Sequence, residues 1–131
     1  MRRSITRALL IAFPALMLIL TPAVSSATSF RNTTTVSIKS ASLAPGGVDV
    51  TVGYSCFPFG YGKYFYNSFG DVEVGQVSGA IGDSSFHPAC NDRKQTQTVF
   101  VPGFFTAGDA AVRLFVCGFD CNSTTKEVKV R

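Results

Sequence analysis

The chain has 131 residues, a formal net charge of +4 and a sequence pI near 9.0. This length suits one domain of ordinary size and excludes a comfortable second one. Three of the twelve Lys and Arg residues, Arg2, Arg3 and Arg7, lie at the start of the chain, so the rest has a net charge of only +1. Beyond that start only Arg93 and Lys94 are adjacent basic residues, so we expect no nucleic-acid binding.

The first residues, MRRSITR, are followed by an apolar run from Ala8 to Leu20 and then by TPAVSSA. A signal peptide typically has a positively charged n-region, an apolar h-region and small residues before the cleavage site. We predict cleavage after Ala27, which makes 1–27 the signal peptide and 28–131 one secreted domain, free of the membrane. Two alternatives are an uncleaved membrane anchor, for which the apolar run is short, and twin-arginine export through Arg2 and Arg3.

Apolar residues alternate along several short stretches of the mature sequence. The clearest is 48–56, VDVTVGYSC, where the valines, Tyr54 and Cys56 share one parity, so we expect Cys56 to point into the core. Similar patterns predict strands in the following segments: 34–43, 71–79 with a break at Gly75 and Gln76, 95–102, 110–117 and 125–131. Between them lie segments rich in turn-forming residues: 43–47, 59–63, 80–85, 87–92, 102–109 and 118–124.

Six or seven short strands in one small domain predict an all-β fold, an immunoglobulin-like antiparallel β-sandwich of about seven strands with two disulfides. A closed barrel with a similar number of strands is the alternative. The chain has no Trp, so the domain lacks the Trp that packs on the disulfide of antibody-type domains.

The four cysteines, Cys56, Cys90, Cys117 and Cys121, all lie in the exported part, which indicates two disulfides. Three pairings are formally possible, and we favour Cys56–Cys90 with Cys117–Cys121 because VCGFDC reads as a turn closed on itself. The alternative is a zinc site that adds His87, but an oxidising compartment favours disulfides. We therefore expect no metal and no cofactor.

Three segments carry a resemblance to known proteins: VDVTVGYSC, CNDRKQTQTVFVPGFFTAGDAAVRLFVC and CGFDCNSTTKEVKVR. With them, the sequence resembles small secreted immunoglobulin-like proteins of actinobacteria over about residues 33–131. The strand pattern with a late C-x3-C is also distantly similar to the neocarzinostatin family. Proteins of that family hold an apolar enediyne chromophore in a cleft, so the resemblance implies an apolar small-molecule carrier as an alternative function.

Residues 56–69, CFPFGYGKYFYNSF, hold seven aromatic side chains. They form either an aromatic binding surface or part of a core that has no Trp. If they bind a ligand, we expect Tyr61, Lys63, Tyr64 and Tyr66 to do so, through their rings, hydroxyls and ammonium group. Three further aromatic residues are candidates for the same end of the domain, although for them we favour a hydrophobic contact beneath a loop: Phe104, Phe105 and Phe119.

Catalytic motifs are not evident in the sequence. His87 is the only histidine, no serine lies in a nucleophile elbow, and Asp71 and Glu73 suit a solvated edge strand better than a glycosidase site. A secreted hydrolase using His87 is the weakest hypothesis. We predict a monomeric, non-catalytic extracellular binding or structural module whose partner is an extracellular protein, a cell-wall glycan or an apolar small molecule.

Overall fold

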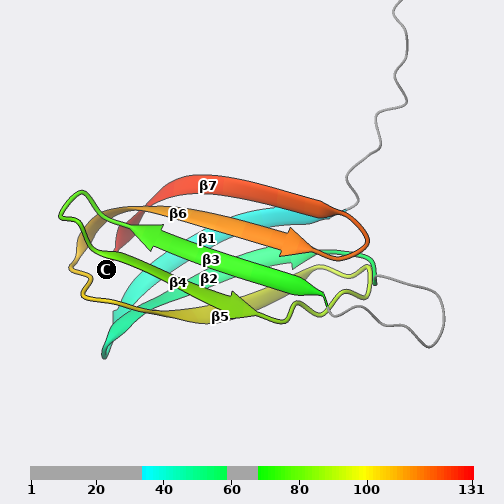
Figure 1. The fold of residues 1–131 in the computed structure, drawn as a ribbon, viewed down its shortest axis with the longest axis horizontal. Coiled ribbons are helices and arrows are strands. Elements are labelled where there is room, and N and C mark those ends of the chain that lie inside the picture. Colours follow the sequence, from blue (N-terminus) through cyan, green and yellow to red (C-terminus); the bar gives the residue numbers. More distant parts are fainter. Residues whose placement is uncertain (1–33, 59–67) are drawn as a thin grey trace, which may run out of the picture.

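The computed structural model describes residues 34–58 and 68–131, which form an all-β domain (Figure 1). No helix that could span a membrane occurs in these two segments. The strands are β1 (Thr35–Ala44), β2 (Gly47–Ser55), β3 (Phe69–Gly75), β4 (Ile81–Phe86), β5 (Gln95–Pro102), β6 (Gly108–Cys117) and β7 (Cys121–Val130). The expected fold class, all-β with about seven strands and two disulfides, is confirmed.

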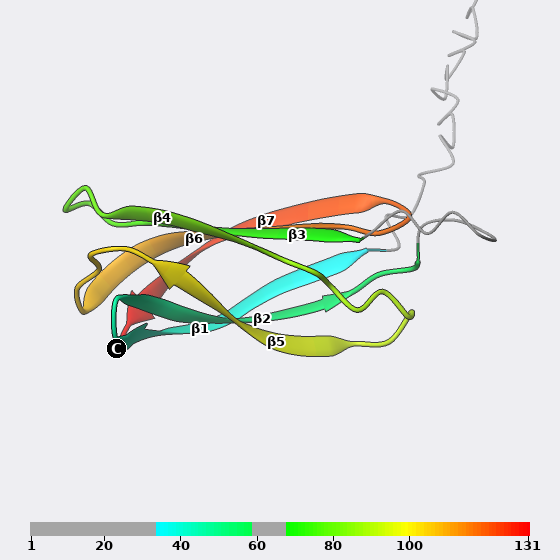
Figure 2. The ribbon, with the colours of Figure 1, turned by 60° about the horizontal axis from the view of Figure 1, so that its bottom comes forward.

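The seven strands follow the order β4-β3-β6-β7-β1-β2-β5. Strands β4, β3, β6 and β7 form one layer and β1, β2 and β5 the other, as Figure 2 shows. The layers are one continuous, barrel-like sheet, because β7 and β1 pair in parallel at Ala41 and Val130. The Leu43 N–H also donates to the Arg131 carbonyl at 2.8 Å. This parallel seam is the one departure from the expected antiparallel pairing among the described strands.

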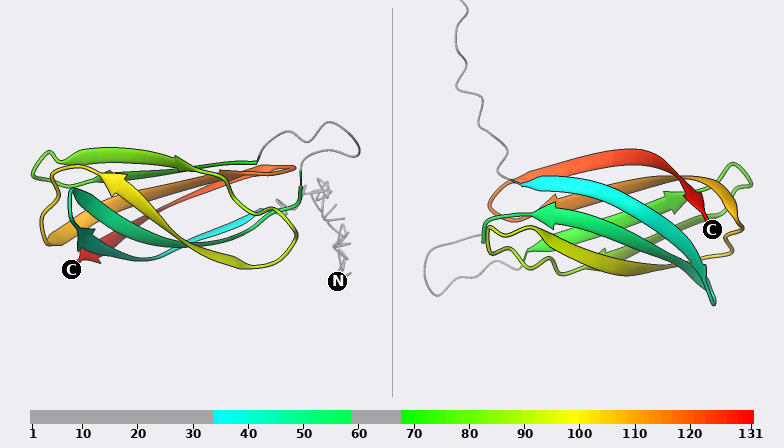
Figure 3. Two further views of the ribbon diagram at one scale, coloured as in Figure 1. Left: turned by 90° about the horizontal axis from the view of Figure 1, so that it is seen from below. Right: turned by 180° about the vertical axis from the view of Figure 1, so that it is seen from behind.

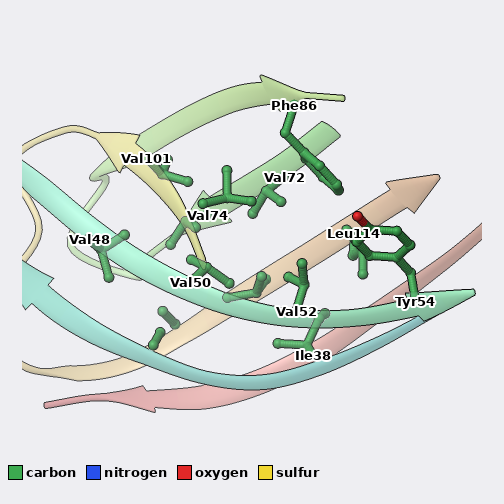
Figure 4. Close-up of a cluster of buried hydrophobic side chains, with 14 of the residues drawn as sticks. Ile38, Val48, Val50, Val52, Tyr54, Val72, Val74, Phe86, Val101 and Leu114 are labelled. Atoms are coloured by element: carbon green, nitrogen blue, oxygen red, sulfur yellow. The ribbon is translucent and has the colours of Figure 1, made fainter. Parts of the chain in front are cut away.

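The core lies between the layers and consists mainly of valine (Figure 4). The predicted alternation in β2 is confirmed, since Val48, Val50 and Val52 are fully buried and Cys56 is 1% exposed. The buried Tyr54 hydroxyl donates to Gln97 Oε1 and accepts the Ala89 N–H, both at 3.0 Å. Burying a hydroxyl group costs little free energy when it both donates and accepts a hydrogen bond. A tyrosine can therefore fill a core that lacks Trp.

Strand β4 contradicts the prediction of a turn at 80–85. The segment has a glycine, an aspartate and two serines, all poor strand formers. Gly82 faces inward, and a Cβ there would lie 2.3 Å from the Pro102 carbonyl oxygen. Only a glycine fits this position, so the apolar alternation that marks the other strands is missing from the sequence.

Both expected disulfides are present, Cys56–Cys90 and Cys117–Cys121. Because all four cysteines are paired, none is available as a thiolate ligand for the alternative zinc site. The second bridge closes the β6–β7 hairpin, where its two cysteines face each other in the register, as the turn reading predicted.

Candidate functional site at the disulfide end

The four residues predicted to bind a ligand, Tyr61, Lys63, Tyr64 and Tyr66, lie in 59–67, outside the described residues. The structure describes the residues on either side of this segment. Phe57 follows β2 and is 38% exposed, and Phe69 begins β3 and is 44% exposed. The flanking residues and the β6–β7 turn lie at one end of the domain, which we call the disulfide end (right in Figure 1).

The two disulfides meet at this end. Gly118, in the loop closed by Cys117–Cys121, is buried, and a Cβ on it would lie 3.0 Å from Cys90 Sγ. The same Cβ would lie 2.3 Å from the Phe57 carbonyl oxygen, which accepts the Phe119 N–H at 3.0 Å. The hairpin turn is therefore packed directly on the bridge that joins β2 to the β4–β5 connection.

A polar cluster, which the sequence analysis missed, fixes the same turn to the start of β1. Thr34 is fully buried, and its N–H donates to Asp120 Oδ1 at 3.1 Å. Its hydroxyl donates to the same carboxylate at 2.5 Å, and the Asn122 side chain donates to the Thr34 carbonyl at 2.9 Å. Thr34 lies 86 residues before Asp120 and 88 residues before Asn122, so the sequence gives no local signal of this contact.

Several aromatic side chains lie at the disulfide end. Phe119 is 65% exposed at the tip of the β6–β7 turn. The Phe69 ring lies against the half-buried Phe115, with centroids 6.3 Å apart, an arrangement that favours both rings. A hollow of about 140 Å³ lies between these two rings, Asp71 and Arg113. Phe57, Phe69 and Phe119 are thus three exposed aromatic residues at the disulfide end, and we call them the aromatic rim.

Of the three candidates for the disulfide end, Phe119 lies there, whereas Phe104 and Phe105 do not. The β5–β6 connection precedes β6, whereas the β6–β7 turn follows it, so the two lie at opposite ends of a 10-residue strand (Figure 3). A strand of this length spans roughly 33 Å. Phe104 is fully exposed there, and Phe105 packs half-buried against the core.

The acidic residues of β3 do not lie on an edge strand, since β3 pairs with both β4 and β6. Burial, and then the charges of Glu73 and Asp83, raise the pKa of Asp71 above its ordinary value. Arg113 Nη1 lies 3.3 Å from Glu73 Oε2, and both side chains are half-exposed, so this ion pair contributes at most about 1 kcal/mol.

The hydrolase hypothesis requires His87 beside an acid and a nucleophile. His87 is exposed in the connection between β4 and β5, next to the buried Pro88. Among residues 34–58 and 68–131, no cluster of three or more His, Cys, Asp or Glu side chains could hold a metal ion.

Comparison with protein-family models and with curated proteins found no match to this chain. The fold class therefore rests on the structure, and function must be argued from the surface of the domain.

Proposed function

We infer that this protein is a secreted, non-catalytic binding module that presents aromatic side chains at its disulfide end to an extracellular partner. The observation that supports this proposal is the rim of Phe57, Phe69 and Phe119, exposed on an end where two disulfides pack on each other. Exposed apolar side chains that gather on one part of a surface often mark an interaction site, and a surface that is already ordered loses little entropy on binding.

Secretion is supported by the predicted signal peptide at 1–27 and by the two disulfides, which persist in oxidising compartments. Among the predicted partners, a cell-wall glycan suits the rim best. Flat rings stack on the apolar faces of sugars and give a large contact area with few rotatable bonds.

The test is co-sedimentation of the oxidised mature protein with insoluble peptidoglycan. We expect Phe119→Ser to weaken binding at least tenfold. Phe104→Ser removes a fully exposed ring from the opposite end and is the control, so its binding should equal that of the wild type. Absence of wild-type binding, or equal losses in both variants, would reject a glycan-binding rim.

The alternative, an apolar small-molecule carrier, needs a concave pocket. Pockets for drug-sized ligands usually measure about 300–1,000 Å³. The hollow beside Phe69 and Phe115 is about 140 Å³, below this range, so the described residues of the disulfide end favour binding across a surface. A carrier would bind one apolar dye molecule per domain, and Phe69→Ser would abolish that binding.

A further inference from the structure

Folding gathers basic side chains that are far apart in the sequence. Two hollows, of about 420 and 390 Å³, share Lys39 as a common wall. Lys94 lines the first, and Lys126, Lys129 and Arg131 line the second, together with one acidic residue, Glu127. We call these five basic side chains the basic band. It runs from the start of β5 across β1 to β7.

Lys39 is placed by a β-bulge. The register of β1 against β2 shifts between Ile38 and Ser40, which makes Lys39 the extra residue. Its side chain crosses Gly53, where a Cβ would lie 3.0 Å from Lys39 Cε, and its ammonium donates to Thr96 Oγ1 at 2.8 Å. Bulges commonly redirect a side chain. Here the bulge places the Lys39 ammonium group beside hydroxyl groups on the surface of the layer formed by β1, β2 and β5.

The second hollow exists because β1 and β7 pair only near their ends, at Ala41 and Val130. Lys126 reaches across the opening and donates to the Ile38 carbonyl at 3.3 Å. The seam therefore has a cation fixed over it, while Lys129 and Arg131 are exposed beside it.

Among the residues that line the two hollows, five are basic and one, Glu127, is acidic, and Asp109 is the register partner of Lys129. The carboxylates of Asp71, Glu73 and Asp83 lie together elsewhere, on β3 and β4, with Arg113 as their basic neighbour. The band thus adds a local positive surface to a mature chain of almost neutral net charge, and such a surface attracts anions.

We propose that the basic band binds an anionic polysaccharide, at a surface separate from the aromatic rim and beyond the function proposed above. Exposed ammonium groups gain little from a single anion, typically less than about 1 kcal/mol per pair. A linear polymer that engages several of them at once gains by multivalency. Hydroxyls of Thr35, Ser37 and Thr96 line the first hollow beside the cations and can pair with those of a sugar.

The experiment measures the affinity of the oxidised mature protein for heparin, an anionic polysaccharide, across a salt series. Lys39→Gln should weaken binding about three- to tenfold and reduce the slope of log K against log salt concentration by about one. Arg113→Gln removes the same charge from β6, outside the basic band, and should bind as the wild type does. Circular dichroism should show that both variants are folded.

Equal losses for Lys39→Gln and Arg113→Gln would mean that net charge alone matters, and would overturn the proposal. So would wild-type binding that does not weaken with salt, or single-stranded DNA that binds as tightly as heparin. Phe119→Ser should leave heparin binding unchanged, so failure of the rim proposal and failure of this one give different results.

Discussion

Replacing Gly118 by alanine tests whether the two disulfides support each other. Gly118 does not have a positive φ, so an alanine can adopt its backbone conformation, and only packing opposes the new methyl group. That group would lie 2.3 Å from the Phe57 carbonyl oxygen, 3.0 Å from Cys90 Sγ and 3.1 Å from Cys56 Cβ. None of these atoms belongs to a flexible side-chain end, so the turn or the Cys56–Cys90 bridge must shift.

Overpacking of this kind costs typically about 1–3 kcal/mol. In a domain of this size, each kcal/mol lowers the melting temperature by roughly 4–8 °C. We therefore expect Gly118→Ala to melt at least about 4 °C, and up to about 24 °C, below the wild type. Gly75→Ala is the matched control, because no heavy atom lies within 4 Å of its Cβ position. Its stability should be unchanged or up to about 1 kcal/mol higher.

The assay is thermal unfolding of the oxidised proteins followed by circular dichroism. A thiol assay should first show that both disulfides have formed in each variant. If Gly118→Ala then melts within about one degree of the wild type, the turn is not tightly packed on the bridge, and the description of a braced end is wrong.

Three further predictions concern other parts of the fold. The double variant Cys117→Ser/Cys121→Ser should lose about 2 kcal/mol of unfolding free energy in urea, since its loop is short; a loss above about 4 kcal/mol would contradict the loop-entropy estimate. Gln76→Ala removes two hydrogen bonds that its side chain makes to the Thr106 backbone, at 2.7 and 3.0 Å, and should cost about 1–2 kcal/mol; an unchanged urea midpoint would contradict this. The raised pKa of Asp71 means that its ionisation opposes folding. The wild type should therefore lose stability relative to Asp71→Asn as pH rises from below 3.8 through the raised value, and a constant difference in a urea series at several pH values would refute it.

The sequence predicted the parts of the fold that obey simple periodicity. The alternation in β2 identified its buried face and the inward direction of Cys56, and the short spacing of Cys117 and Cys121 identified the hairpin bridge. The sequence did not predict β4, because its inward-facing Gly82 packs against the Pro102 carbonyl, a contact that only the folded chain reveals.

The surface was less predictable, because long-range pairing decides which residues meet. Phe119 lies at the disulfide end as expected, but Phe104 lies at the other, since β6 separates their two loops. Lys39 and Lys126 do not form a basic run in the sequence, yet they line one hollow because β1 and β7 are neighbours in the sheet. The Thr34–Asp120 contact is hidden for the same reason.

The parallel seam also affects the order in which the domain can assemble. Strand β1 lies between β2 and β7, so one side of β1 has no strand partner until β7 pairs with it. The β1–β2 and β3–β4 hairpins can form early, because these contacts are local. Closure of the barrel-like sheet requires β7 to reach β1, which is far from it in the sequence. Docking of β7 is thus the step at which a partly folded chain becomes a closed domain.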